Sequence, residues 1–218
     1  MDNFYFSQQE LNTVVQAFCQ QNAPRFLYFW GDAASGKTHL TLAVVEHAQR
    51  HYGKRCLYLP LAQLVEQASP AVFESLEKQA LICLDELEAI EGRPEWEEAL
   101  FHCFNRLQDA ECQLLIASRH NPATLSIKLP DLQSRLASGL VYQLDNLNDN
   151  AKQQVLIVQS HARGLDMTME VAQYILRHYS RDLIALMTFL ALLDKASMAA
   201  QRRLTIPFVK QVLLDAKN

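Results

Sequence analysis

The sequence lacks a long hydrophobic run, a basic excess and a leader-like start. No apolar stretch reaches the roughly 18 residues that a membrane-spanning helix needs, so we expect no membrane segment. Asp2 follows Met1, and this acidic start argues against a signal peptide. Lysine and arginine number 20 against 24 aspartates and glutamates, which gives a formal net charge of −4. This balance argues against nucleic acid as the main partner, and we expect no sequence-specific DNA binding.

Paired cysteines are also absent. The five cysteines are odd in number, form no C-x-x-C motif and lie mostly in apolar runs. We interpret them as buried, reduced cysteines of a cytoplasmic protein. The chain contains neither an internal repeat nor a low-complexity segment. Its 218 residues, half of them apolar, suffice for one large or two small domains with a substantial core.

Residues 31–38 form a complete G-x-x-x-x-G-K-T phosphate loop. An apolar run of strand composition, 25–30, precedes the loop, and residues 39–51 follow it with helical spacing of apolar side chains. Between a strand and a helix, such a loop points backbone N–H groups at a phosphate. Lys37 would reach the outer phosphates and the Thr38 hydroxyl would hold Mg²⁺. The alternative is a chance match in a loop. The predicted nucleotide-binding residues here are Gly31, Asp32, Ala33, Ala34, Ser35, Gly36, Lys37, Thr38 and His39.

A second motif ends an apolar strand in two acidic residues. Residues 80–86 read Ala-Leu-Ile-Cys-Leu-Asp-Glu. Because ligands bind at the carboxyl ends of parallel strands, Asp85 is a candidate ligand of Mg²⁺. Glu86 would orient or deprotonate an attacking water, which makes it a candidate catalytic residue. The alternative is a pair of solvated carboxylates in a turn.

Strand and helix patterns alternate through the first two thirds of the chain. Candidate strands cover 25–30, 55–60, 80–85, 112–118 and 140–144, and candidate helices lie near 38–52, 70–79 and 94–110. Apolar strands joined by helical crossovers predict an α/β fold, in which helices cover both faces of a parallel five-strand sheet. We assign this three-layer αβα nucleotide-binding domain to residues 1–146.

The pattern changes after about residue 146, where strand signals end. Asn148, Thr168 and Ser180 are expected to cap three successive helices, and Pro207 to begin a fourth. These signals predict a small all-helical domain at residues 147–218.

The phosphate loop, the acidic strand end and the helical second domain resemble the AAA+ ATPases. Finer features resemble the DnaA family within them. Asp2-Asn3-Phe4 is similar to the D-N-F that opens the DnaA ATPase region, and Leu129 to Leu136 is similar to the segment that ends in its S-R-[LF] arginine finger. The run 204–210 resembles the last helix of the Hda-type regulatory homologues of DnaA. The chain also ends without the DNA-binding domain of DnaA, which resembles the Hda architecture.

The resemblance implies roles for three more residues. Arg135 would be an arginine finger that acts in trans, in the nucleotide site of a neighbouring subunit. Its alternative is a surface arginine paired with Asp131 one turn earlier. Arg181, in a segment similar to the R-E-L of sensor II, would contact the outer phosphate of the chain's own nucleotide, or else be a solvated arginine beside Asp182. Phe4 would pack near the base, or act as an ordinary hydrophobic staple of the first helix.

Three positions depart from the family pattern. The short clamp-binding peptide of Hda proteins is missing before Asp2, so either the true start lies further upstream or the protein does not use the DNA polymerase sliding clamp. Arg119 stands at the sensor I position, where DnaA has an aspartate. The tryptophan that follows the arginine-finger segment is absent after Leu136.

The resemblance implies a protein that binds ADP or ATP with Mg²⁺. Two functions follow from it. The first is a regulator that docks on ATP-bound initiator DnaA, supplies Arg135 in trans and so promotes hydrolysis of the initiator's ATP. The second is an active AAA+ ATPase, such as a helicase loader or an initiator fragment, with Glu86 performing chemistry. An arginine finger also implies contacts between subunits, and a homodimer is plausible.

Overall fold

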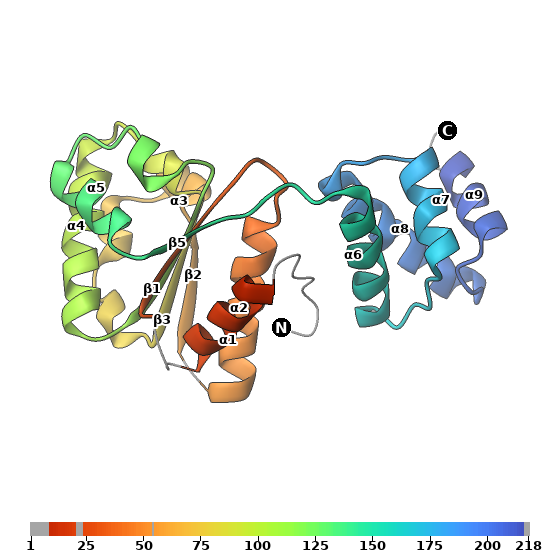
Figure 1. Cartoon of the computed structure of the whole chain (residues 1–218), viewed down its shortest axis with the longest axis horizontal. Helices are drawn as coiled ribbons and strands as arrows, with labels where there is room; N and C mark the ends of the chain where they lie inside the picture. The colour runs from red at the N-terminus through yellow and green to blue at the C-terminus, as the bar shows by residue number, and fades with distance from the viewer. Residues whose placement is uncertain (1–8, 21–23, 54, 216–218) are drawn as a thin grey trace. The chain divides into compact units, whose positions relative to one another are not determined.

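A computed structural model describes residues 9–20, 24–53 and 55–215 of the chain. The described chain divides into two compact units between Asn146 and Leu147. The first unit is built of alternating strands and helices, and the second is built of helices (Figure 1).

The described residues of the first unit form a five-stranded sheet in which every neighbouring pair is parallel. This arrangement confirms the predicted parallel sheet. The strand order is β2-β3-β4-β1-β5, so β4 lies between β1, which leads into the phosphate loop, and β3, which ends in the acidic pair. The strands are β1 Phe26–Trp30, β2 Cys56–Pro60, β3 Leu81–Asp85, β4 Gln113–Ser118 and β5 Leu140–Gln143.

Burial along the strands follows their place in the sheet. Every residue of β3 and β4 is buried, as expected for interior strands that helices cover on both faces. β5 lies at an edge of the sheet and is exposed at both of its ends, Leu140 and Gln143. The mostly apolar strands β3 and β4 therefore lie inside the sheet, because only two covered faces can bury all of their side chains.

Helices cover both faces of the sheet. Figure 1 shows α1 and α2 on one side and α3, α4 and α5 on the other, which completes the three-layer αβα arrangement. These helices are α1 Gln9–Cys19, α2 Lys37–Tyr52, α3 Leu61–Gln67, α4 Pro94–Asp109 and α5 Pro130–Ala137.

The segment after β2 differs from the prediction of one helix at 70–79. The α-helix there is α3, Leu61–Gln67, and it starts directly at the end of the strand. Two 3₁₀ turns follow, η1 Pro70–Phe73 and η2 Leu76–Lys78. Ser75 between them has a φ of 58°, in the left-handed region, and this conformation interrupts any continuous helix across the segment.

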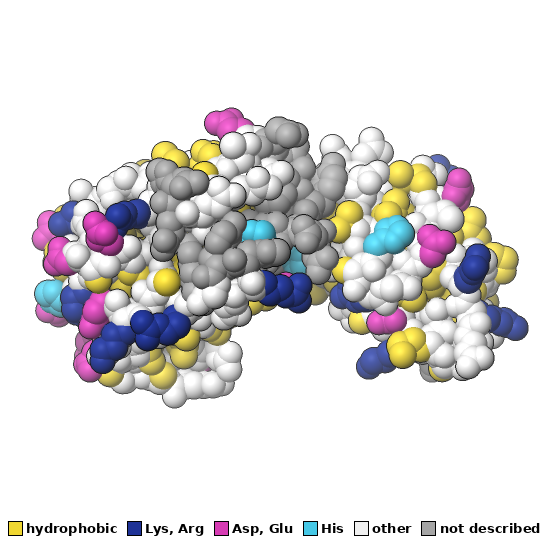
Figure 2. Space-filling model, turned by 90° about the horizontal axis from the view of Figure 1, so that it is seen from below, with side chains coloured by type: hydrophobic (Ala, Val, Ile, Leu, Met, Phe, Trp, Pro, Cys, Tyr) yellow, Lys and Arg dark blue, Asp and Glu magenta, His cyan; other side chains and the backbone are white. Residues whose placement is uncertain are grey.

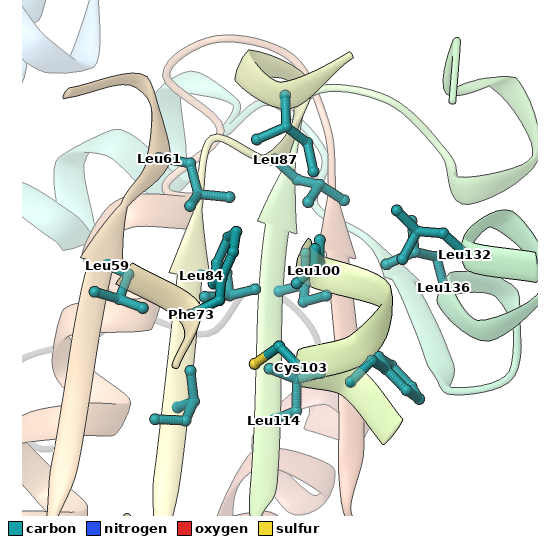
Figure 3. Close-up of a cluster of buried hydrophobic side chains, with 14 of the residues drawn as sticks. Leu59, Leu61, Phe73, Leu84, Leu87, Leu100, Cys103, Leu114, Leu132 and Leu136 are labelled. Atoms are coloured by element: carbon teal, nitrogen blue, oxygen red, sulfur yellow. The ribbon is translucent and has the colours of Figure 1, made fainter. Parts of the chain in front are cut away.

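A cluster of leucines and aromatic residues joins the sheet to the α3–α5 layer. Figure 3 shows Leu84 and Leu114 of the strands facing Leu100 of α4, with Leu132 and Leu136 of α5 beside them. All five are buried, and each such side chain stabilises the fold by about 1.5–3 kcal/mol relative to its exposed state. The short helix α5 is therefore fixed to the core by two leucines of its inner face.

The second unit contains α6 Asp149–Ala162, α7 Met169–His178, α8 Leu183–Ala200 and α9 Ile206–Asp215. Asn148 and Thr168 cap α6 and α7 as predicted, because their side chains accept hydrogen bonds from backbone N–H groups one turn later. The cap of α8 corrects the prediction. Asp182 Oδ1 accepts from the Ala185 N–H at 2.8 Å, whereas the Ser180 hydroxyl accepts from the Asp182 N–H at 3.0 Å. The fourth helix begins at Ile206, one residue before Pro207.

Helix α8 also corrects the expectation that no apolar segment is long enough for a membrane span. Its 18 residues have a mean hydropathy of 1.7 and, among the described helices, meet that criterion by length and composition. Phe189, Leu190 and Leu193 of α8 are buried in the apolar core of the helical unit. Core helices of soluble domains meet the same criterion, so this composition is weak support for a membrane segment.

Candidate nucleotide-binding site

The phosphate loop joins β1, which ends at Trp30, to α2, which begins at Lys37. The Gly31 N–H donates to the Ser118 carbonyl at 3.2 Å, which extends the β1–β4 pairing into the loop. A Cβ on Gly31 would lie 2.3 Å from the backbone oxygen of Leu144, so any other residue would displace backbone there. Gly36 caps α2 with a φ of 92°, a conformation that favours glycine. Both glycines of the motif are thus required by the backbone.

Lys37 is buried inside this loop. Its ammonium donates to the carbonyl oxygens of Gly31 and Asp32, both at 2.7 Å, and to the Ser35 hydroxyl at 3.3 Å. Burial lowers the pKa of Lys37 from its ordinary value. A desolvated ammonium held by neutral oxygens lacks a bonded counter-anion, and it is therefore prepared to bind an anion such as a phosphate.

Other residues of the loop and of the first turn of α2 are more exposed than Lys37 or turn the backbone. Thr38 and His39 are exposed on the first turn of α2. Asp32 is exposed, and its carboxylate accepts a hydrogen bond from the Asn146 side-chain amide at 3.0 Å. Ala34 has a φ of 63°, in the left-handed region. The structure brings residues 31–39 together at one junction between a strand and a helix, and the N-terminus of a helix is a suitable place for an anion.

Asp85 and Glu86 lie at the carboxyl end of β3. Asp85 is 1% exposed, and its two carboxylate oxygens accept from the Tyr58 hydroxyl at 2.9 Å and from the Glu86 N–H at 3.0 Å. Glu86 has a φ of 60°, so the chain turns sharply at this residue. Partial burial and then the nearby Asp85 charge raise the pKa of Glu86. The pair is therefore one buried, hydrogen-bonded carboxylate followed by a partly exposed one whose pKa is raised.

The oxygens of Thr38 and Asp85 are of the kind that Mg²⁺ prefers. Each carboxylate oxygen of Asp85 carries one hydrogen bond and keeps a lone pair for an ion or for water bound to it. Among residues 9–20, 24–53 and 55–215, no group of three or more His, Cys, Asp or Glu forms a metal cage. Two protein ligands, Thr38 and Asp85, fit Mg²⁺, because this ion usually keeps several waters and binds phosphate oxygens beside one or two protein ligands.

Sequence reasoning missed one carboxylate, Glu88. It lies on the 3₁₀ turn η3, Leu87–Ile90, and bonds to the tip of β4. Glu88 Oε2 accepts from the Ser118 hydroxyl and from the Arg119 N–H, both at 3.0 Å, while Oε1 lies 3.1 Å from the Arg119 guanidinium. The negative charge of Glu88 also raises the pKa of Lys37, against the larger, lowering effect of burial. Its position three residues after Asp85 was the only signal in the sequence, and its partners lie 30 and 31 residues away.

Arg135 lies on α5, in the layer opposite α2. Its guanidinium donates to the Gln108 side-chain oxygen at 3.4 Å, and its side chain is half-buried. Over the described part of the chain, no ion pair joins Arg135 to Asp131. The hydrogen bond of the guanidinium is thus to a neutral side-chain amide, and the role of Arg135 as an arginine finger stays a prediction.

Arg181 precedes α8 in the helical unit. Its guanidinium lies 3.6 Å from the Asp149 carboxylate, and its side chain is 71% exposed. Its backbone oxygen accepts from the Lys152 ammonium at 2.7 Å. Asp182, the next residue in the sequence, caps α8. The contact between Arg181 and a nucleotide stays a prediction, and Phe4 lies outside the described residues.

Together the fold and this junction define a P-loop protein of the AAA+ class. The family model described as the bacterial DnaA ATPase domain matches residues 5–143. The model described as the Hda lid domain matches residues 149–213. The chain therefore belongs to the DnaA family, with a lid domain of the Hda type.

The chain is also similar to an uncharacterised protein and to solved structures of DnaA. An uncharacterised protein of Haemophilus influenzae is 44% identical over 189 residues, which is 86% of this chain and 81% of the relative. Domain III of the replication initiation protein DnaA of Thermotoga maritima has a TM-score of 0.78 at 19% identity, covering 98% of this chain and 95% of that one. AMPPCP-bound DnaA of Aquifex aeolicus has a TM-score of 0.68 at 23% identity, covering 89% and 63%. The two solved structures support the fold alone.

Proposed function

We propose that this chain is a nucleotide-binding regulator of bacterial replication initiation. It docks on ATP-bound DnaA and supplies Arg135 to the initiator's nucleotide site, so that the bound ATP is hydrolysed. The match of its helical unit to the Hda lid domain supports the regulatory role. Membership of the DnaA family supports a role in replication initiation.

The observation that carries the proposal is the state of Arg135. An arginine finger acts only if its guanidinium is accessible and is not neutralised by an acid of its own subunit. Among the described residues Arg135 meets both conditions, because it is partly exposed, forms no ion pair and donates to the neutral side-chain amide of Gln108. Its helix is held by the buried side chains of Leu132 and Leu136, so the cation projects from a rigid element. Such a cation raises phosphoryl-transfer rates by about 10³–10⁵.

In this proposal the chain's own nucleotide, ADP or ATP with Mg²⁺, is a structural ligand. Lys37 binds the outer phosphates, the helix-start N–H groups bind the inner ones, and Thr38 and Asp85 hold the metal ion. The buried, low-pKa ammonium of Lys37 supports this assignment. AMPPCP was bound to the DnaA of Aquifex aeolicus, whose fold is similar.

A second candidate is an active AAA+ ATPase. One observation favours it: Glu86 follows the buried Asp85 and has a raised pKa, which are properties of a general base. The regulator and the ATPase differ in where turnover occurs. A regulator stimulates hydrolysis by DnaA, whereas an ATPase hydrolyses its own nucleotide.

The test mixes purified chain with ATP-loaded DnaA and follows hydrolysis, with and without the DNA-loaded sliding clamp. We expect stimulation that depends on the concentration of the chain and exceeds its own turnover. Absence of stimulation under both conditions, together with rapid turnover by the chain alone, would favour the ATPase. Comparing the two conditions also shows whether the clamp is a partner, and light scattering of the chain alone tests the proposed homodimer.

A further inference from the structure

Glu97 is a buried carboxylate that the proposed nucleotide site does not use. It lies in the first turn of α4 and is 1% exposed. Its Oε2 accepts from the N–H groups of Lys128 at 2.8 Å and Leu129 at 3.1 Å, and its Oε1 accepts from the Gly92 N–H at 3.0 Å. One carboxylate therefore joins the turn before α4 to the segment that leads into α5.

Backbone donors, rather than a basic side chain, compensate for the burial of this acid. Over the described ranges, no ion pair includes Glu97. A buried carboxylate is costly unless it is hydrogen-bonded, and bonds to a charged acceptor are roughly twice as strong as neutral ones. The N-terminus of α4 also favours a negative charge in its first turn. Because all three donors belong to the backbone, the carboxylate fixes the course of the chain itself.

The helix that carries Arg135 is short, and Glu97 holds its start. α5 has eight residues, too few for a stable helix in isolation, and its N-cap Leu129 provides no side-chain hydrogen bond. Leu132 and Leu136, one turn apart, anchor its inner face in the core (Figure 3). These two anchors fix a line on the helix surface. The Glu97 hydrogen bonds add a third fixed point at one end, which also determines the direction of the helix.

Helix α4 also contacts the guanidinium of Arg135. The guanidinium donates to the side-chain oxygen of Gln108 at 3.4 Å. Gln108 follows Glu97 by about three helical turns, so both side chains lie on the side of α4 that faces α5. Arg135 lies about 9 Å along the helix axis from Leu129, at 1.5 Å per residue. A tilt at the start of α5 therefore moves the guanidinium as well.

We propose that Glu97 is a positioning residue for Arg135. By holding the backbone before α5, it sets the direction in which the guanidinium projects toward the nucleotide of a neighbouring molecule. The inference rests on the proposed function, in which Arg135 acts in the nucleotide site of DnaA. A misplacement of about 1 Å can lower a rate by about 100-fold, even when the altered residue is far from the reacting atoms. Loss of the Glu97 hydrogen bonds therefore affects the hydrolysis step more than the docking of the two proteins.

The test measures the turnover of ATP-loaded DnaA against increasing concentrations of the full chain, which separates the maximal rate from the half-saturating concentration. Glu97→Gln keeps the shape of the side chain, but it removes the charge and directs amide N–H groups at a backbone N–H. We expect its maximal rate to fall roughly 10- to 100-fold, with a nearly unchanged half-saturating concentration and an unchanged affinity for the chain's own Mg·ADP. Glu97→Asp keeps the charge but is one methylene shorter, so we expect a smaller decrease.

Arg106→Gln provides a matched control on the same helix. Arg106 donates to the Phe73 carbonyl at 2.9 Å and lies 3.6 Å from the Glu77 carboxylate, so it joins α4 to the two 3₁₀ turns rather than to α5. We expect this variant to lower the melting temperature without changing the maximal rate. Every assay is run well below the melting temperature of the variant, so a loss of stability alone does not lower the rate.

Hydrogen exchange and a double variant test whether Glu97 acts through Arg135. The amides of Lys128 and Leu129 should exchange faster in Glu97→Gln than in the wild type, because they lose their acceptor. In a chain that carries Arg135→Ala, adding Glu97→Gln should lower the remaining stimulation no further, because no guanidinium is left to position.

Two results would overturn the inference while leaving the proposed function intact. The first is a full maximal rate with folded Glu97→Gln; if that variant does not fold, the same criterion applies to Glu97→Asp. The second is a further loss in the double variant as large as the loss in Glu97→Gln alone, because Glu97 would then act independently of Arg135. Full stimulation by Arg135→Ala, or none by the wild type, would instead contradict the proposed function, and the inference would fail with it.

Discussion

At the scale of residues, the candidate nucleotide site depends on backbone conformations that only glycine adopts easily and on the burial of one lysine. Gly31 and Gly36 have conformations or contacts that exclude other side chains, and Lys37 is desolvated among neutral oxygens. The consensus spacing predicted the loop because each fixed position has a physical requirement of its own. Glu88 could not be predicted in the same way, since a glutamate after a strand is ordinary until the fold brings β4 beside it.

Lys37→Ala is expected to abolish nucleotide binding, because the ammonium is the cation that the loop directs at the phosphates. Ligand binding stabilises the folded state by mass action, so the rise in melting temperature on adding Mg·ADP should also disappear. Calorimetric titration and thermal unfolding measure the two effects. Lys128→Ala, which alters an exposed lysine, is the control. An unchanged nucleotide affinity in Lys37→Ala would refute the phosphate-loop assignment.

Any ATPase activity of the chain alone is expected to depend on the ionisation of Glu86. A general base must be deprotonated, and the pKa of this carboxyl is raised. As the pH is lowered, turnover should therefore begin to fall at a pH above the pKa of an ordinary glutamate. Glu86→Gln should remove that turnover at all pH values. A pH–rate profile of both forms measures this. Residual turnover in Glu86→Gln with the same acid limb would exclude Glu86 as the base.

At the scale of elements, strands were more predictable than the connections between them. β3 and β4 are mostly apolar and buried along their whole length, and such strands are stable only between two covered faces. Helix α3 was missed because it follows β2 without a loop, and Pro60 is both the last residue of the strand and the N-cap of the helix. The cap of α8 was misplaced by two residues because Ser180 and Asp182 are both good caps, and only the geometry selects Asp182.

Asp182→Ala is expected to destabilise the helical unit by about 1 kcal/mol, because the first turn of α8 loses its side-chain acceptor. Ser180→Ala should cost less, since that hydroxyl accepts from Asp182 rather than from the helix. Asp182→Asn should retain most of the stability. Hydrogen exchange of the α8 amides reports the effect locally. A larger loss of protection in Ser180→Ala than in Asp182→Ala would contradict the observed cap.

For the whole molecule, the charge distribution predicts weak DNA binding. The formal net charge is −4, and on the face drawn in Figure 2 acidic and basic side chains are intermixed on the first unit. Phosphate contacts dominate non-specific affinity and require clustered cations. We expect duplex binding to be weak and independent of sequence in a fluorescence titration at physiological salt. Sequence-specific, sub-micromolar binding would show that the function of the helical unit has been misjudged.

The central claim concerns a contact between molecules, with Arg135 acting in the nucleotide site of DnaA. The most direct measurement is the turnover of ATP-loaded DnaA in the presence of wild-type, Arg135→Ala or Arg135→Lys chain at matched concentrations. Arg50→Ala, an exposed arginine of α2 paired with Glu46, serves as the control. Both Arg135 variants should keep nearly the same melting temperature and nucleotide affinity, since surface substitutions usually change stability by no more than about 0.5 kcal/mol.

Arg135→Ala is expected to remove most of the stimulation, because the finger stabilises charge that develops only in the transition state. Arg135→Lys should fail as well, since a point charge does not reproduce the planar guanidinium. Arg50→Ala should stimulate like the wild type. Full stimulation by Arg135→Ala, with normal folding and nucleotide binding, would contradict the account.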